Sequence, residues 1–221
     1  MVAKQYTYKP DFFEPENFEH AKRIVIGYGN IETPDKWIEE TKWIIELLAN
    51  YNFLNTDSIV VDWGVGVGRV AKEIIDTFGC KVIGVDINES MLAYATEYCN
   101  SPNFIGISPS EFQNYTGEIT NAISIWALQH SITVQEDLDI IKSKLTPTGR
   151  LFIFEARYRT IPVERPADIL DGPTVRWAIG DKSNFYLIDK LFKIEDHGSF
   201  PERFNMPENE DSWWGFFKNK I

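Results

Sequence analysis

Residues 60–69 of the chain read VVDWGVGVGR. A short hydrophobic run that contains Asp62 passes directly into a loop with glycine at every second position, Gly64, Gly66 and Gly68. Glycine permits positive φ and lets a ligand approach the backbone closely, because it has no Cβ. Where such a loop leads into a helix, the first N–H groups of the helix have no partner within the helix and can face a ligand. The stretch therefore predicts a strand, a ligand-binding loop and a helix in succession.

A second hydrophobic run, VIGVD at residues 82–86, ends in Asp86, twenty residues after Gly66. A carboxylate at the tip of a second strand can accept hydrogen bonds from the two hydroxyls of a ribose. Asp62 distinguishes between a dinucleotide and S-adenosylmethionine as the ligand, because its charge would repel a pyrophosphate and attract the ammonium of a methionine moiety. Arg69 stands where the last glycine of a GxGxxG dinucleotide motif would be. These residues favour S-adenosylmethionine over a dinucleotide.

Strands and helices alternate through the middle of the chain, and the strands are apolar throughout, which is typical of a parallel sheet covered by helices on both faces. We expect helices over 34–50, 68–78, 90–98 and 134–145, and strands over 59–62, 81–86, 103–107, 122–127 and 150–155. Two more strands, 191–195 and 213–218, have no helical pattern between them and should be antiparallel. The expected fold is a doubly wound, mostly parallel, seven-stranded α/β sheet of Rossmann-like type, with a C-terminal antiparallel pair and an N-terminal helical or irregular arm.

A chain of 221 residues is long enough for one such domain, which we expect to span residues 1–221. Residues 1–50 would form the arm and first helix, 58–155 the cofactor-binding core, and 156–221 a substrate-side loop with the C-terminal strands. No regular pattern is assigned to residues 158–182. Aromatic residues gather at both ends of the chain, and we expect them to pack on the central domain or, as the alternative, to line a substrate pocket: Tyr6, Tyr8, Phe12, Phe13, Phe18, Trp213, Trp214, Phe216 and Phe217.

Composition excludes some partners. The net charge of −11 would repel a phosphate backbone, so a nucleic-acid substrate is disfavoured. No window approaches the ~20 apolar residues that a membrane-spanning helix needs, and the N-terminus lacks the apolar core of a signal peptide. Cys80 and Cys99 are the two cysteines. We therefore expect a soluble, reducing, cytoplasmic setting, with no membrane partner and no metal site.

Residues 59–154 resemble the class I S-adenosyl-L-methionine-dependent methyltransferases, in particular the methyltransferase type 11-like domains. The similar segments are residues 60–68 (first motif), 85–87 (second motif), 91–95 (MLAYA), 107–112 (ISPSEF), 122–130 and 145–151 (LTPTGRL). The chain departs from the common pattern at Asn121 and at the pair Ser110-Glu111, and no subfamily is assigned. The resemblance implies S-adenosyl-L-methionine as cofactor and S-adenosyl-L-homocysteine as product, held by Asp62, Gly64, Gly66, Gly68, Asp86, Ile87, Met91, Ser110, Glu111 and Trp126.

Two residues follow strands at the edge where open α/β sheets bind ligands, and both are candidate catalytic residues. His130 comes just after the fourth strand and titrates near neutral pH; it could equally be a capping or packing residue. Glu155 ends the fifth strand. The expected function is in-line methyl transfer to a small molecule. The alternatives are a catalytically silent cofactor-binding or partner-binding protein and, supported only by Asp86 and the fold class, an NAD-dependent oxidoreductase. The acceptor and the oligomeric state are left open.

Overall fold

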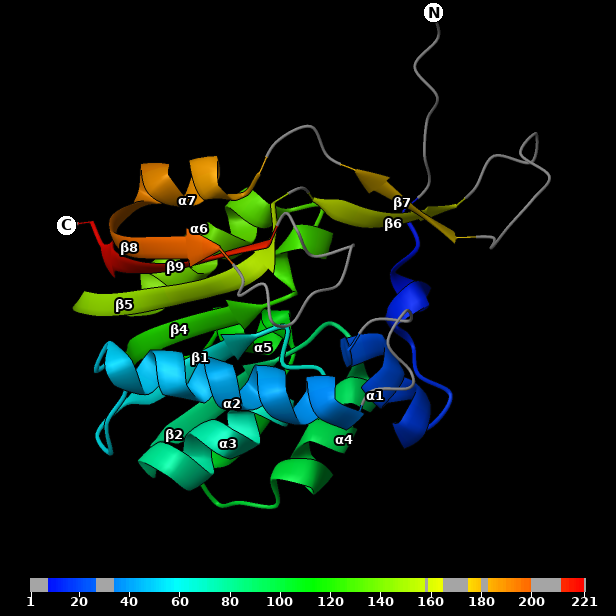
Figure 1. The fold of residues 1–221 in the computed structure, drawn as a ribbon, viewed down its shortest axis with the longest axis horizontal. Coiled ribbons are helices and arrows are strands. Elements are labelled where there is room, and N and C mark those ends of the chain that lie inside the picture. The colour runs from blue at the N-terminus through cyan, green and yellow to red at the C-terminus, as the bar shows by residue number, and fades with distance from the viewer. Residues whose placement is uncertain are drawn as a thin grey trace, which may run out of the picture.

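The computed structural model describes residues 8–26, 34–157, 159–164, 175–179, 183–199 and 212–220. Its centre is a seven-stranded sheet with the order β3-β2-β1-β4-β5-β9-β8, in which β1 to β5 are parallel and β9 is antiparallel to both β5 and β8 (Figure 1). The strands are β1 Ile59–Trp63, β2 Lys81–Val85, β3 Phe104–Ile107, β4 Ile119–Ile125, β5 Leu145–Ala156, β8 Phe192–Ser199 and β9 Ser212–Asn219. The predicted doubly wound sheet and its antiparallel C-terminal pair are confirmed.

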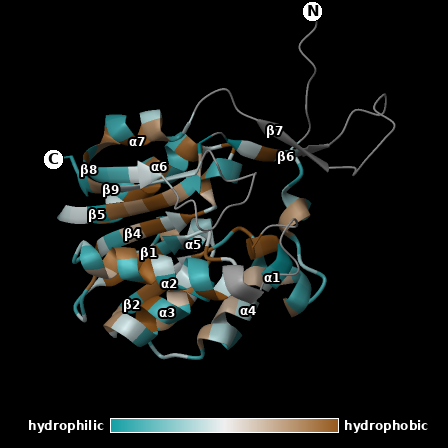
Figure 2. Ribbon diagram, viewed as in Figure 1, coloured by the Kyte–Doolittle hydropathy of each residue, from teal (hydrophilic) through white to brown (hydrophobic). Residues whose placement is uncertain are grey.

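Helices cover both faces of this sheet. They are α1 Phe18–Ile26, α2 Pro34–Asn50, α3 Arg69–Phe78, α4 Glu89–Cys99, α5 Pro109–Gln113, α6 Val134–Lys144 and α7 Phe185–Leu191, with short 3-10 helices η1 Pro10–Phe13 and η3 Leu128–His130. Successive residues of a strand point to opposite faces: Phe152 and Phe154 pack with α2 and α3, whereas Leu151 and Ile153 pack with α5, α6 and α7. The core therefore has two layers, one on each side of the sheet, and Figure 2 shows the hydrophobic residues concentrated along the central strands.

Local signals explain where α3 and α4 begin and end. Gly68 (φ 78°) precedes α3, and Gly79 (φ 68°) follows it and donates its N–H to Ile75. Asn88 caps α4 by accepting the N–H of Met91 at 3.1 Å, which satisfies one of the otherwise unpaired donors of the first turn. These helices agree with the predictions over 68–78 and 90–98 to within one residue at each end.

Other boundaries differ from the prediction. The strand expected over 122–127 runs from Ile119 to Ile125, because the backbone turns at Trp126 (φ 56°). The strand expected over 150–155 already begins at Leu145, which pairs with Ile119 before a register shift. Leu191, predicted to start a strand, is the last residue of α7. A backbone turn, a pairing partner and a packed helix thus decide these three boundaries.

A second, two-stranded sheet lies in the region to which no regular structure was assigned. It pairs β6 Thr160–Glu164 with β7 Val175–Ile179 in antiparallel fashion. The carbonyl of Pro162 accepts the N–H of Lys9 at 3.0 Å, so the N-terminal arm is joined to this ribbon. Proline is tolerated at such an edge because it has no N–H to leave unpaired.

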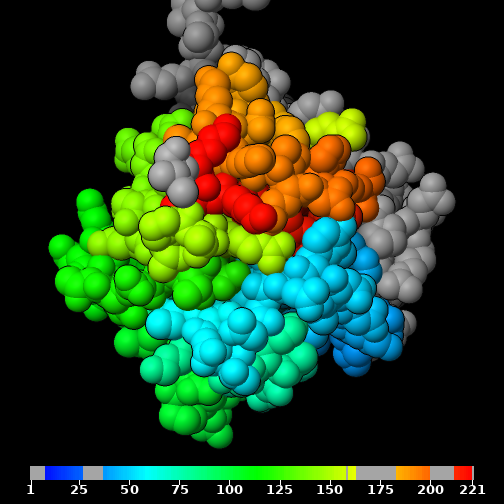
Figure 3. Space-filling model, turned by 90° about the vertical axis from the view of Figure 1, so that its left-hand side faces the viewer, coloured from blue at the N-terminus to red at the C-terminus, as the bar shows by residue number. Residues whose placement is uncertain are grey.

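The two ends of the sheet are used differently. The carboxyl ends of the parallel strands face α1, β6 and β7 (Figure 1). At the opposite end, β9 (red), β8 and α7 (orange) and the end of α2 (cyan) lie against one another (Figure 3). There Arg150 pairs with Glu195 at 2.7 Å and reaches the carbonyls of Tyr51 and Asn52 at 3.3 and 3.1 Å. Charged side chains are therefore paired with one another at this end of the sheet, and the candidate ligand-binding site lies at the opposite end.

In the part of the chain that the structure describes, no helix is both long and apolar enough to cross a membrane. Cys80 and Cys99 are both buried and free.

Candidate functional site

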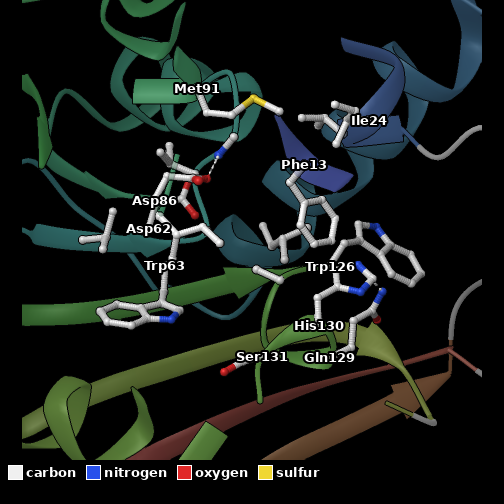
Figure 4. A pocket seen from close by; sticks show the side chains of 18 of the residues that line it. Phe13, Ile24, Asp62, Trp63, Asp86, Met91, Trp126, Gln129, His130 and Ser131 are labelled. Atoms are coloured by element: carbon white, nitrogen blue, oxygen red, sulfur yellow. Dashed lines mark hydrogen bonds between the residues drawn. The ribbon is translucent and has the colours of Figure 1, made fainter. Parts of the chain in front are cut away.

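A cavity of about 760 Å³ opens at the carboxyl ends of the parallel strands (Figure 4). Most of it is built by the glycine loop after β1, the end of β2 with the start of α4, the segment from β4 to α6, and the N-terminal arm with α1. Pro109 of α5, Ala156 of β5 and Thr160 of β6 add to the lining. Its described lining includes Tyr8, Phe12, Phe13, Val25, Asp62, Gly64, Gly66, Arg69, Asp86, Ile87, Met91, Trp126, Gln129, His130, Ser131, Ile132, Asp137 and Thr160.

The glycine loop is held in place by close packing and by the neighbouring strand. Gly64 and Gly66 have φ of 82° and 54°, values that side chains other than glycine rarely adopt. A Cβ on Gly64 would lie 2.2 Å from the Cβ of Ala127. The N–H of Gly64 donates to the carbonyl of Val85 at 2.7 Å. Glycine is therefore required at position 64, because the loop touches the chain just after β4.

Asp86 lies at the end of β2 with its carboxylate inside the loop. One oxygen accepts the N–H of Gly66 at 2.9 Å, and the other accepts the N–H of Asn88 at 3.0 Å. Burial raises the pKa of Asp86, and these backbone N–H groups oppose the rise. A carboxylate has about four lone-pair positions, so each oxygen can accept a further hydrogen bond from a ribose hydroxyl. The geometry fits the role predicted for Asp86.

Asp62 is the second acid of the cavity and is only 3% exposed. Burial raises the pKa of Asp62 to about 7; the charge of Asp86 adds to the rise, and Arg69 opposes it. Figure 4 shows its carboxylate beside that of Asp86. A cationic group placed here would favour the ionised form. The site thus suits the ammonium of a methionine moiety.

A buried ionic network stands behind the wall of the cavity. Glu40 of α2 is 1% exposed, and one of its oxygens accepts hydrogen bonds from the Arg69 guanidinium at 2.6 Å and from the Trp126 indole N–H at 3.1 Å. Arg69 is 3% exposed and also donates to the hydroxyl of Thr41 at 2.8 Å. Arg69 and Trp126 line the cavity. A single helix residue therefore fixes two wall residues from distant parts of the chain.

Trp126 lies just after β4, although the prediction placed it within the strand over 122–127. Its backbone has φ 56°, and its N–H donates to the carbonyl of Phe154 at 2.7 Å. Its ring packs on that of Phe154 with centroids 4.5 Å apart. A non-glycine residue in this region costs on the order of 1–3 kcal/mol and persists where its surroundings hold it there. The hydrogen bond to Glu40 is one of those restraints.

His130 lies on the cavity wall, 5.1 Å from the ring of Phe13 between centroids. Its Nδ1 is 2.6 Å from the carbonyl oxygen of Thr160. A carbonyl only accepts, so Nδ1 carries the proton and Nε2 accepts from the amide of Gln129 at 3.1 Å. The same Gln129 accepts the N–H of Ala156 at 2.6 Å, which fixes its orientation. Burial lowers the pKa of His130 to about 4, so the imidazole is neutral at physiological pH.

Glu155 does not line the cavity, although it was predicted as a catalytic residue. It is 1% exposed and accepts a hydrogen bond from Asn184, at the start of α7, at 3.0 Å. Along β5 it has the orientation of Leu151 and Ile153, toward α6 and α7, whereas Ala156 faces the cavity. Because successive side chains of a strand point to opposite faces, Ala156 faces the cavity and its neighbour Glu155 faces away from it.

Burial raises the pKa of Glu155 to about 8 from its ordinary value of 4.5. Between these two pH values the folded state keeps a proton on Glu155 that the unfolded state has released. The contribution of Glu155 to the free energy of unfolding is therefore complete below pH 4.5 and is lost as the pH rises through 8. We expect the stability gain of Glu155→Gln over the parent protein to grow between pH 5 and pH 8 in urea unfolding. The exposed Glu136→Gln should show no such trend, and a constant difference for both variants would contradict the assignment.

Three more predicted cofactor residues lie outside the cavity. Gly68 precedes α3, and a Cβ there would lie 2.8 Å from the Cys99 sulfur, so this glycine serves helix packing. The carboxylate of Glu111 bonds to the N–H of Ser108 at 2.7 Å and forms a capping box that starts α5. Ser110 contacts the hydroxyl of Ser108 at 3.0 Å. In this segment it is Pro109 that reaches the cavity.

Sequence reasoning missed several wall residues. The arm contributes Tyr8, Phe12 and Phe13, which agrees with the alternative that some terminal aromatics line a pocket. Asp137 comes from α6, and no pattern singled it out. The sequence does contain a signal for Glu40, because this charged residue lies on the same helix face as the apolar residues Ile44 and Leu48. A charge on the buried face of a helix indicates a buried partner.

Comparison with known proteins agrees with this geometry. Residues 60–149 match the family model of a methyltransferase domain. None of the curated proteins matches the sequence.

Several solved structures have a similar fold. The PH0226 protein from Pyrococcus horikoshii OT3 is 18% identical, with a TM-score of 0.66 over 92% of this chain and 100% of that one. Magnesium protoporphyrin IX methyltransferase from Synechocystis PCC 6803, solved with S-adenosylhomocysteine bound, is 17% identical, with a TM-score of 0.64 over 95% and 97%. The N-methyltransferase NodS from Bradyrhizobium japonicum WM9, in complex with S-adenosylhomocysteine, is 12% identical, with a TM-score of 0.61 over 86% and 90%. At such identities the likeness shows the fold.

Proposed function

We propose that this chain, which carries a methyltransferase domain on the class I S-adenosylmethionine-dependent methyltransferase fold, transfers a methyl group from S-adenosylmethionine to a small-molecule acceptor. The observation that carries the proposal is the joint position of Asp62 and Asp86 in one cavity with the glycine loop. Asp86 suits the ribose of either cofactor, but Asp62 would repel a pyrophosphate and matches a cationic methionine moiety. Asp62 therefore disfavours an NAD-dependent oxidoreductase.

S-adenosylmethionine supplies an electrophilic methyl group on a positively charged sulfur. The protein has to bind and align the two reactants, and good alignment can contribute roughly 7–11 kcal/mol to the lowering of a barrier. In the proposal, Asp86 holds the ribose hydroxyls, while Ile87 and Met91 pack against the base. Asp62 faces the ammonium, and Trp126 forms the wall at the methionine end. The glycine loop lets these groups approach the backbone.

Of the two catalytic candidates, the proposal retains His130. It faces the cavity, and because Nδ1 carries the proton held by Thr160, only Nε2 can take a proton from an acceptor. Gln129 already donates to Nε2, and the low pKa of His130 makes it a weak base. A contact role toward the acceptor suits it better than a strong acid–base role. Glu155 is not part of the proposal, since it faces α7.

A small acceptor is supported by the size and the walls of the cavity. The arm and α1 contribute Phe13 and Val25 to the lining of this space of about 760 Å³, so an acceptor larger than the cavity would have to displace them. The overall charge of −11 disfavours a nucleic acid.

Isothermal titration with S-adenosylhomocysteine tests the cofactor site, and transfer of a labelled methyl group to members of a metabolite panel tests the activity. We expect binding and labelled product. Binding without transfer to any member would favour a silent cofactor-binding protein. Absence of binding at millimolar cofactor would contradict the proposal altogether.

A further inference from the structure

The part of the cavity that the proposed cofactor would leave free is lined by a different set of side chains. Figure 4 shows Asp62, Asp86 and Met91 on one side and Gln129, His130 and Ser131 on the other. We name the second side the acceptor chamber. To it we assign the lining residues that contacts, chain neighbours or electrostatics connect to His130 and Ser131: Tyr8, Phe12, Phe13, His130, Ser131, Ile132 and Asp137. It combines three aromatic rings, an aliphatic side chain and one carboxylate.

Asp137 is the carboxylate of the acceptor chamber. It is half-buried and accepts a hydrogen bond from the hydroxyl of Ser131 at 2.5 Å. Tyr8 lies close enough that, after burial itself, the negative charge of Asp137 is the second cause of the raised pKa of that phenol. The arm and α6 thus both line this cavity, and the phenol of Tyr8 lies within electrostatic range of the Asp137 charge.

Few cations face this carboxylate. Arg159 donates to the carbonyl of Ser131, in the same segment, but does not line the cavity. Arg69 is the one Lys or Arg side chain among the described residues that line the cavity, and Glu40 pairs with it at 2.6 Å. His130 is neutral, as its hydrogen bonds and lowered pKa indicate. A negatively charged acceptor would therefore meet repulsion and a positively charged one attraction.

We propose that the acceptor is a small amine with an apolar body, whose nitrogen lies beside Asp137 and whose body packs on the aromatic rings of the arm. The inference rests on the proposed methyl transfer. Aromatic faces and a carboxylate both attract an ammonium group, and the attraction of the rings increases where water is excluded. Phe12 and Phe13 pack edge to face with centroids 5.3 Å apart and offer such faces together with Tyr8.

The ammonium must lose a proton before it can react. The proton passes to the Asp137 carboxylate and from there to solvent. The nitrogen lone pair then forms the new N–C bond as the C–S bond breaks, and the electron pair of that bond goes to sulfur. Sulfur becomes neutral, and the methylated nitrogen carries the positive charge.

The test uses the full chain and panels of primary amines, alcohols and carboxylates that share the same aryl or alkyl bodies. Titration with S-adenosylhomocysteine comes first, since it measures the cofactor site without an acceptor. Labelled methyl transfer and binding to the S-adenosylhomocysteine-loaded protein are then compared within each panel. We expect amines to bind and to be methylated, and carboxylates to do neither.

Asp137→Asn should lower kcat/KM for amines by roughly 10–100-fold, as expected for loss of a charge-assisted contact, and leave the affinity for S-adenosylhomocysteine unchanged. Asp139→Asn, on the exposed face of the same helix, is the matched control and should change neither. A merely structural role for Asp137 would lower the melting temperature without changing the ratio of amine to alcohol turnover.

Three results would overturn the inference: methylation of alcohols or carboxylates in preference to amines, no amine binding at millimolar concentration, or equal amine turnover by Asp137→Asn and Asp139→Asn. Each leaves the proposed function standing as long as S-adenosylhomocysteine binds. Failure of that binding would instead contradict the proposed function.

Discussion

Asp86→Ala is expected to weaken the binding of S-adenosylhomocysteine by about 10²–10⁴-fold. The variant removes two hydrogen bonds from ribose hydroxyls to a carboxylate, each worth about 1.5–3 kcal/mol, and every 1.4 kcal/mol is about a factor of ten in Kd. It also removes the acceptor that holds the N–H groups of Gly66 and Asn88, so the loop loses part of its order. Isothermal titration of the purified variant measures the effect.

Asp139→Ala is the control for this experiment, because Asp139 is exposed on α6 and does not line the cavity. It should bind S-adenosylhomocysteine as the parent protein does. Asp86→Asn keeps one oxygen acceptor, so its affinity for S-adenosylhomocysteine should lie between those of Asp86→Ala and Asp139→Ala. Affinity within threefold of the parent for Asp86→Ala, with an intact circular dichroism spectrum, would remove Asp86 from the site.

Glu40→Ala is expected to lower the free energy of unfolding by about 3–5 kcal/mol, the usual cost of leaving one partner of a buried ion pair alone. Arg69 would then be an uncompensated charge in a position only 3% exposed. The loss is a large share of the 5–15 kcal/mol by which domains are usually stable. The indole of Trp126 would also lose its acceptor, so cofactor affinity should fall as well. Urea unfolding and titration with S-adenosylhomocysteine measure the two effects.

The neighbouring Glu39 is exposed on the same helix, and Glu39→Ala should change the unfolding free energy by no more than about 0.5 kcal/mol. The double variant Glu40→Gln/Arg69→Gln removes both charges of this pair and should regain much of the stability that Glu40→Ala loses. Equal stability of Glu40→Ala and Glu39→Ala would show that the buried pair does not stabilise the fold.

Much of the sheet could be predicted because its signals are local. The apolar strands β1 and β2 and the caps of α3 and α4 lie within short stretches of sequence, and the structure confirms them. The β6–β7 ribbon could not be predicted, because its stability depends on pairing and on the contact between Lys9 and Pro162. Those partners are far apart in the sequence.

In the candidate site, too, some residues could be predicted from the sequence and others could not. The loop glycines Gly64 and Gly66 and the acid Asp86 lie where the motif predicts them. Glu111 lies in a segment similar to the family's adenine loop, yet its carboxylate bonds to Ser108 and caps the N-terminus of α5. A motif match indicates a position along the chain and does not give the direction of a side chain.

The sequence by itself determined the fold class and the cofactor end of the cavity, because a strand, a glycine loop and two acids are fixed by short-range geometry. Only the tertiary structure decided what else shares the cavity. It placed Tyr8 of the arm in one cavity with Asp137 of α6, and Glu40 behind Trp126. It also turned Glu155 away, since alternate residues of a strand face opposite sides of the sheet and β5 presents Ala156 to the cavity instead.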